Sequence, residues 1–479
     1  MESSFNAFVY GSSSLPQSVT SLPAYTQTPF RARRELTEHV AELSSDISNK
    51  HAKPWATLRV YSKAPVGSMP MFVEGEKITG SVTLDTGMSQ SRHVSCVKVI
   101  ARGELSTGLS KANQLTFLES STTLWSKDIH SERHDQMHWS FSIHLPREVV
   151  VSSTTMTKSG SSTVDSVQAC ALPPTFMERN IRACIRYNLI VHIARSKFRE
   201  DSNLQMAWTY VPASKPDPPS ELRQLAYQEN SPLLGPQADP NGWYTLPSAQ
   251  IYGTLFKNRV VEVTLKLSLA QPLSYTRGSV IPLSLTLSST DSQALDLLSS
   301  RQALTVRLRR KIISNRAQNL AEYNASWTPG VFSTEPVIDI ADAVWWQHPD
   351  SEDTTPSAGI TMASDAATIQ SKTRLYRELE GEILLSRHLK PTFHISHFRV
   401  EYSVVVLPFN TTGFVPSTSS QRFHNGPILE QRVEIMTRFP QGPRPISHSP
   451  PEYQNQNISS NVRSSLTSAR SSLPPSRGY

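Results

Sequence analysis

The stretch HWSFSIHL, residues 138–145, decides the fold class of this chain. Apolar side chains occupy every second position of it, at Trp139, Phe141, Ile143 and Leu145. Successive side chains of a β-strand point to opposite faces, so the stretch predicts a strand with one buried and one solvent-exposed face. His138 and His144 fall on the exposed face, which favours a solvated role for both over metal binding.

The same alternation recurs in two groups of segments. The first group comprises residues 57–61, 77–84, 94–101 and 182–194. The second group comprises residues 260–269, 279–287, 304–312, 400–407 and 433–436. The chain of 479 residues is too long for one hydrophobic core, which stops growing at about 250–300 residues. Because strands with one apolar face need a second sheet to cover it, the sequence predicts an all-β fold with two consecutive antiparallel β-sandwich domains.

Shifts of composition place the two predicted domains at residues 54–211 and 248–439. Residues 212–247 are predicted to be a Pro-rich linker with a short helix at 221–227, because their many prolines interrupt strands and longer helices. Residues 1–53 carry serine, proline and mixed charge with little periodicity. We expect them to form a flexible N-terminal arm.

Three further segments are predicted to lie outside the sandwich cores. Within the arm, residues 33–47 could become helical on contact with a partner. Residues 314–372 form a variable insertion, whose Trp345-Trp346 pair is either a partner surface or packed onto the sandwich. Residues 440–479 are rich in Ser, Pro, Asn and Arg, lack lysine and keep no apolar periodicity, so they are predicted to be a disordered tail.

Cysteine content and charge narrow the class of protein. Cys96, Cys170 and Cys184 are odd in number and lack C-x-x-C spacing, which predicts neither a disulfide framework nor a zinc site and fits a reducing compartment. Forty-seven Lys and Arg against 40 Asp and Glu give a net charge of +7, which favours peripheral contact with an anionic membrane or an acidic partner. No apolar run approaches the ~18–20 residues of a membrane span and no secretion signal is visible, so a cytoplasmic location is expected.

The densest basic run is RLRRK, residues 307–311. It continues an alternation that begins at Leu304 and Val306, so it is more typical of the solvent face of a strand than of a phosphate-binding patch. Nucleic acid is not an expected partner, because Lys and Arg are not interleaved with aromatic residues on one predicted sheet face.

The common catalytic motifs are missing from the sequence. It contains no G-x-S-x-G, H-E-x-x-H, phosphate-binding P-loop or G-x-G-x-x-G pattern. Cys184 has no histidine partner nearby in sequence and is expected to be a buried structural thiol. We therefore predict a protein that is not an enzyme, with no catalytic residues, no cofactor and no metal site.

Several short segments, in this order and spacing, resemble the arrestin family. In the first predicted domain they are VEGEKITGSV (73–82), VKVIARG (97–103), FSIHLP (141–146), LPPTF (172–176) and IRYNL (185–189). In the second they are YTRGSVIPL (275–283), KPTF (390–393) and VEYSV (400–404). The resemblance covers about residues 54–438, is greatest to α-arrestins of fungal type, and implies immunoglobulin-like sandwiches. No segment matches the interdomain polar core of visual and β-arrestins, so the sequence leaves open whether an activation latch exists.

The tail carries the motif to which we assign function. Pro450-Pro451-Glu452-Tyr453 is a PPxY sequence, whose two prolines favour the polyproline II conformation. At about three residues per turn, Pro450 and Tyr453 can share the face that enters the aromatic groove of a WW domain. We therefore predict a WW-domain dock at these four residues.

Two other features accompany this motif. Leu22-Pro23-Ala24-Tyr25 resembles an LPxY variant of the same dock and is a candidate for a second, weaker one. Ser449 directly precedes the prolines, and a phosphate there would add about 1.5–2 negative charges. Ser449 is thus a candidate regulatory phosphosite that weakens WW binding, unless the serines of the tail merely keep it soluble.

The arrestin resemblance also implies partners and a location. The WW partner would be a HECT-type ubiquitin ligase, and the cargo a membrane transporter or receptor that is ubiquitinated and endocytosed. The adaptor would be cytoplasmic and recruited to the plasma membrane and endosomes. The alternative is a retromer-type arrestin-fold sorting scaffold on endosomes, which recruits no ligase and against which the PPxY motif argues.

Overall fold

The computed structural model describes thirteen stretches of the chain. They are residues 36–44, 53–85, 87, 93–107, 114–127, 136–156, 163–179, 181, 183–196, 199–314, 337–347, 374–417 and 426–451. Strands dominate these stretches and only two α-helices occur in them, which confirms the predicted all-β class.

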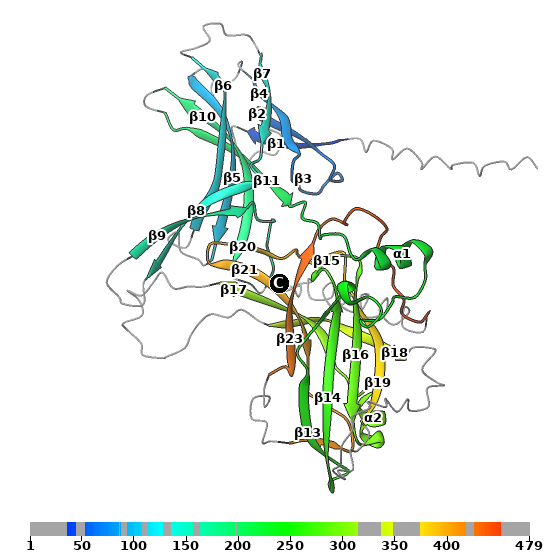
Figure 1. The fold of residues 1–479 in the computed structure, drawn as a ribbon. Coiled ribbons are helices and arrows are strands. Elements are labelled where there is room, and N and C mark those ends of the chain that lie inside the picture. The colour runs from blue at the N-terminus through cyan, green and yellow to red at the C-terminus, as the bar shows by residue number, and fades with distance from the viewer. Residues whose placement is uncertain are drawn as a thin grey trace, which may run out of the picture.

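Residues 37–211 form one group of strands, shown in blue to green in Figure 1. The strands are β1 (Thr37–Ser44), β2 (Pro54–Ser62), β3 (Met71–Val73), β4 (Lys77–Asp85), β5 (Val94–Ser106), β6 (Gln114–Ser126), β7 (Gln136–His144), β8 (Glu148–Met156), β9 (Thr163–Ala171), β10 (Cys184–Arg195) and β11 (Ser202–Val211). They pair as a four-stranded sheet β1-β2-β4-β7, a five-stranded sheet β3-β11-β10-β5-β6, and the hairpin β8-β9.

Residues 243–436 form the second group, a curled sheet of twelve strands. The strands are β12 (Trp243–Thr245), β13 (Ala249–Leu255), β14 (Arg259–Ala270), β15 (Ser274–Thr276), β16 (Val280–Ser289), β17 (Val306–Ser314), β18 (Ile338–Gln347), β19 (Leu375–Leu384), β20 (Phe393–Ile395), β21 (Phe398–Val406), β22 (Phe414–Pro416) and β23 (Leu429–Met436). The order is β15-β23-β21-β17-β18-β19-β16-β14-β13-β22, with β12 on β14 and β20 on β21. Among the described residues, no strand pairing joins the two groups.

The strand β7 contains most of the stretch from which the fold class was predicted. Met137, Phe141 and Ile143 are buried, whereas His138 and His144 are exposed as expected. His138 exchanges a hydrogen bond of 2.9 Å with Thr83 on the neighbouring β4. The alternation therefore places its apolar side chains in the core, as predicted.

Two short α-helices accompany the second group of strands. The helix α1 (Glu221–Glu229) confirms the helix predicted at 221–227; the Ser220 side chain accepts from the Arg223 N–H at its start. The helix α2 (Ser292–Leu298) begins after Asp291, whose carboxylate accepts from the Ala294 N–H. A side-chain acceptor at this position satisfies a backbone donor that the first turn leaves free.

The two groups of strands meet at a mixed aromatic and ionic junction. Phe176, which follows β9, packs on Phe398 with ring centroids 5.3 Å apart and on Phe393 at 5.9 Å. Arg310 of β17 donates two hydrogen bonds of 2.8 Å to the Glu178 carboxylate. Arg310 is only 8% exposed, so this bidentate pair is largely shielded from solvent.

Two predictions about segments outside the cores were wrong. Residues 37–44, expected in a flexible or helical arm, form the strand β1, because His39, Ala41 and Leu43 alternate inward and the backbone pairs with β2. Residues 338–347, expected in a variable insertion, form β18, which connects β17 to β19.

The Trp345-Trp346 pair lies on β18 and is packed, which confirms the second of its two predicted roles. Trp345 is 4% exposed and pairs across the sheet with Gly381. A Cβ on Gly381 would lie 2.5 Å from the Trp345 ring, so the missing side chain makes room for the indole. Trp346 donates its indole N–H to Glu380 at 3.2 Å.

Candidate docking site at the C-terminal segment

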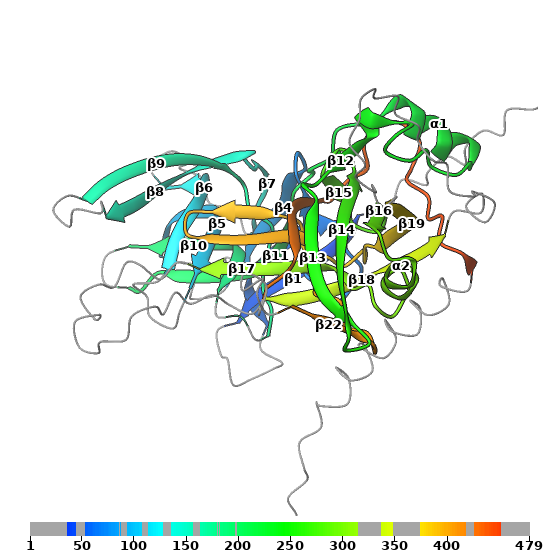
Figure 2. The ribbon, with the colours of Figure 1, turned by 60° about the horizontal axis from the view of Figure 1, so that its bottom comes forward.

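Residues 437–451, here called the C-terminal strap, follow β23 and lie against the second group of strands. Thr437 and Arg438 donate their backbone N–H groups to Ser214 O at 3.1 and 2.9 Å. The strap then runs beside α1, as the orange-red coil in Figures 1 and 2 shows. This part of the predicted disordered tail is therefore ordered, because its backbone and serine side chains bind to the linker and the sheet. Residues 452–479 lie outside the described residues.

A small proline-rich pocket lies where the strap crosses the linker. Its proline walls come from residues far apart in sequence: Pro216, Pro219, Pro272, Pro282, Pro440 and Pro445. Arg223 of α1 also lines it, donates to Gln271 O at 2.9 Å and lies 4.8 Å over the Trp243 ring. Burial lowers the pKa of this guanidinium. The pocket thus joins linker, α1, sheet and strap into one packed unit.

The last turn of the strap is held by Glu382 of β19, which is only 5% exposed. The Ser447 hydroxyl donates a short hydrogen bond to Glu382 Oε1, and the His448 backbone N–H donates to Oε2 at 3.1 Å. The Ser449 hydroxyl lies 2.9 Å from the Ser447 hydroxyl. We call this cluster of Ser447, His448, Ser449 and Glu382 the Glu382 clasp.

The His448 ring stacks on Tyr227 of α1, with centroids 6.4 Å apart and ring planes at 13°. Burial lowers the pKa of His448, and the carboxylates of Glu382 and Glu380 oppose that shift only in part. The imidazole is therefore held in its neutral form at pH 7. His448 Nε2 has no hydrogen-bond partner within the part of the chain that the structure describes.

Alternation along β19 explains why Glu382 faces the strap. Leu379, Gly381 and Ile383 are buried on the core side, so Glu378, Glu380 and Glu382 share the opposite face. Gln237 donates to Glu378 at 3.5 Å and Trp346 to Glu380 at 3.2 Å. Each carboxylate of the row thus accepts a hydrogen bond from another segment, and Glu382 accepts from the strap.

The structure places the predicted site residues as follows. Pro450 is half-buried at the end of the strap, and Pro451 is exposed. Ser449 is 7% exposed, which the sequence did not suggest for a candidate phosphosite. Glu452 and Tyr453 of the dock, and the candidate second dock Leu22-Pro23-Ala24-Tyr25, lie outside the described residues.

Sequence analysis missed the residues that hold the dock in place. Glu382 and Tyr227 carry no motif, and the contact of Glu382 with Ser447 spans 65 residues of sequence. The only local hint is a glutamate in an otherwise apolar stretch, GEILL at 381–385.

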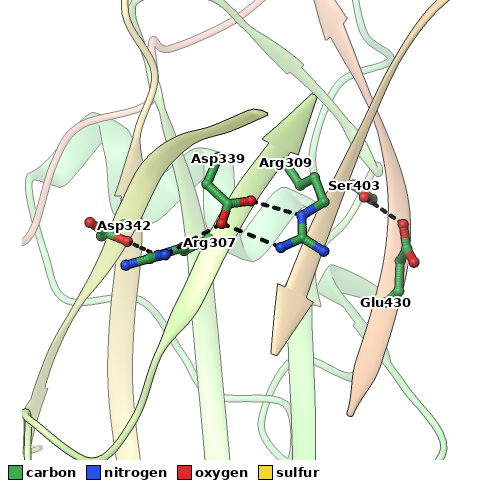
Figure 3. A network of polar contacts seen from close by, with 6 residues as sticks. All are labelled: Arg307, Arg309, Asp339, Asp342, Ser403 and Glu430. Atoms are coloured by element: carbon green, nitrogen blue, oxygen red, sulfur yellow. Dashed lines mark hydrogen bonds and ion pairs between the residues drawn. The ribbon is translucent and has the colours of Figure 1, made fainter. Parts of the chain in front are cut away.

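Two arginines of the basic run at 307–311 pair with aspartates of a neighbouring strand (Figure 3). Arg309 donates to Asp339 of β18 at 2.7 Å, and Arg307 donates to both Asp342 and Asp339. These hydrogen bonds raise the pKa values of both guanidiniums. Arg310 points to the opposite face and reaches Glu178. Arg307 and Arg309 therefore lie on the solvent face of a strand, as the sequence favoured, although β17 is not a sheet edge, because it pairs with both β18 and β21.

No protein-family model matches the chain, and no curated protein shows significant sequence similarity to it. In the described stretches, no three His, Cys, Asp or Glu side chains are grouped as a metal site. None of the described helices is long and apolar enough to cross a membrane. Fold and site together define an all-β protein whose C-terminal segment docks on its own sheet.

Proposed function

We propose that this chain is an arrestin-type adaptor that recruits a WW-domain HECT-type ubiquitin ligase to membrane cargo. Its β-domains select a transporter or receptor, and Pro450-Pro451-Glu452-Tyr453 binds the ligase. The adaptor works from the cytoplasm at the plasma membrane and endosomes, where its net charge of +7 favours contact with anionic lipid.

One observation carries this proposal. The first two residues of the PPxY motif are the last two of the strap, with Pro450 half-buried and Pro451 exposed. A dock at this point is tied to the folded body by a short segment, so a bound ligase is kept close to whatever the body binds. The all-β class and the segments that resemble arrestins support the same proposal.

The proposed mechanism is to bring the ligase and the cargo close together. Tethering ligase and cargo to one chain turns their encounter into an intramolecular event with a high effective concentration, and no catalytic group is needed. A polyproline dock loses little conformational entropy on binding, so the contact can be weak and reversible.

Pull-down of the full chain on the WW domains of a HECT-type ligase tests the proposal. Tyr453→Ala should remove most of the bound chain, because the tyrosine fills the pocket that defines the motif. Tyr479→Ala is a matched control, since it also follows a proline pair in the tail but misses the spacing. Tyr25→Ala measures the share of the second candidate dock. Retention of the Tyr453→Ala chain at the wild-type level would show that the motif is not the dock, and a wild-type chain that binds no WW domain would favour the retromer-type scaffold.

A further inference from the structure

The Glu382 clasp lies directly beside the proposed dock. Ser449 is its last residue, and Pro450 is the first residue of the PPxY motif. Ser449 is 7% exposed and Pro450 is half-buried, so the first proline of the dock has one side against the body. The face of the motif that enters the aromatic groove of a WW domain includes Pro450, so a Pro450 held against the body is not free to dock in full.

The contacts of the clasp are specific and polar. A nearly buried carboxylate accepts one hydroxyl and one backbone N–H from adjacent strap residues, and charge-assisted hydrogen bonds of this kind are among the stronger ones in proteins. The stacking of His448 on Tyr227 fixes the same turn from the side of α1. Opening the clasp must break these contacts together.

We propose that the Glu382 clasp is an autoinhibitory contact, closed in the resting chain, that limits access of WW domains to Pro450-Pro451-Glu452-Tyr453. The inference rests on the proposed WW dock and adds its regulation. In the closed state a WW domain has limited access to the motif. In the open state the strap beyond residue 446 leaves the body together with the motif. The binding-competent fraction of the chain then sets the apparent affinity.

Phosphorylation of Ser447 would open this clasp. A phosphate adds about 1.5–2 negative charges. The charged groups that act on this turn are the carboxylates of Glu382 and Glu380, so a phosphate here meets like charge and loses the Ser447 hydroxyl as a donor. Ser449 directly precedes Pro450, where a phosphate is expected to weaken WW binding itself, so Ser447, three residues before Pro450, is the better position for a switch.

The first test compares the full chain with the peptide 444–458, which has no body to bind. Both are titrated with the same WW domain by calorimetry. A clasp closed in about nine chains of ten makes the full chain bind about tenfold more weakly than the peptide. Glu382→Ala, which leaves the motif itself unchanged, should bring the full chain to the affinity of the peptide. Glu378→Ala is the matched control, since that carboxylate lies on the same face but accepts only from Gln237 at 3.5 Å.

The variant Ser447→Asp gives a second, independent test of the clasp. It should raise the affinity of the full chain and leave that of the peptide unchanged. Amide hydrogen exchange at His448, whose N–H donates to Glu382, reports the clasp without any ligand: Glu382→Ala should remove its protection.

The outcomes separate the two proposals. Equal affinities of peptide and wild-type chain, or a Glu382→Ala chain that binds like wild type, would overturn the clasp while leaving the dock intact. A peptide that fails to bind any WW domain would overturn the dock, and with it a clasp that regulates docking; protected His448 exchange would then assign the strap a purely structural role.

Discussion

At the scale of single residues, the most consequential side chains are those whose charge is buried. Arg310 and Glu178 bind each other across the junction, and Glu382 binds the strap. A buried ion pair such as Arg310–Glu178 adds little net stability while intact, because its attraction is offset by lost hydration, but removal of one partner leaves an uncompensated charge. Exposed pairs such as Arg399 with Glu401 contribute far less, because water and salt screen them.

Arg310→Ala should therefore destabilise the chain. We expect a loss of about 2–4 kcal/mol in the free energy of unfolding, since Glu178 loses both hydrogen bonds from Arg310 and is left with the electrostatic attraction of Lys390. Arg399→Ala, the exposed control, should cost about 0–1 kcal/mol. Urea unfolding followed by tryptophan fluorescence measures both. Equal midpoints for the two variants would show that the junction pair contributes nothing.

His448 gives the clasp a dependence on pH. Its pKa is lowered in the closed clasp, where Tyr227 and the carboxylates of Glu380 and Glu382 face it, and has its ordinary value of about 6.5 in an open strap. The closed state is thus fully favoured above pH 6.5 and loses stability as pH falls below it. As the pH falls from 7.5 to 5.5, the affinity of the full chain for the WW domain should therefore rise relative to that of the peptide 444–458. His448→Gln should abolish this difference; if wild type shows none, the histidine is not involved.

At the scale of elements, alternation predicted ten of the 23 described strands, and the ones that it missed include β1 and β18. The apolar alternation of both is weak: β1 buries only His39 and half-buries Ala41, and β18 begins with Ile338, Asp339 and Ile340, all at least partly exposed. What fixes them is pairing with neighbours, β2 for one and β17 and β19 for the other. Pairing between distant strands depends on the whole sheet and leaves no local mark in the sequence.

Gly381→Ala tests the packing of β18 on β19. The added Cβ would lie 2.5 Å from the Trp345 ring, so the strands or the indole must move at a cost of about 1–3 kcal/mol. Gly235→Ala is the matched control, because a Cβ there meets no atom within 4 Å. Thermal unfolding compares the two. A Gly381→Ala chain as stable as the Gly235→Ala chain would contradict the close approach of Trp345.

At the scale of the whole molecule, the dock could be predicted from the sequence, whereas the clasp beside it is visible only in the structure. The motif Pro450 to Tyr453 could be recognised from sequence, because its chemistry lies in four consecutive residues. The clasp could not, because Glu382 and Ser447 meet only when the strap folds back over a strand 65 residues earlier. The same limit applied to Glu178 and Arg310, which are 132 residues apart.

The distribution of lysine makes a prediction about the whole chain. Residues 440–479 contain none, so an adaptor that is itself ubiquitinated on lysine must carry the modification within residues 1–439. Mass spectrometry of the chain modified by a WW-domain ligase should find every lysine-linked site there. Its modification should also fall strongly with Tyr453→Ala; undiminished modification of that variant would mean that the ligase reaches the chain by another route.

The most direct measurement of the central claim is a calorimetric titration of the peptide 444–458 with the WW domains of a HECT-type ligase. The account predicts saturable one-to-one binding that Tyr453→Ala abolishes for the most part, because the tyrosine and the two prolines together fill the groove. Equal affinities of the wild-type and Tyr453→Ala peptides would contradict it.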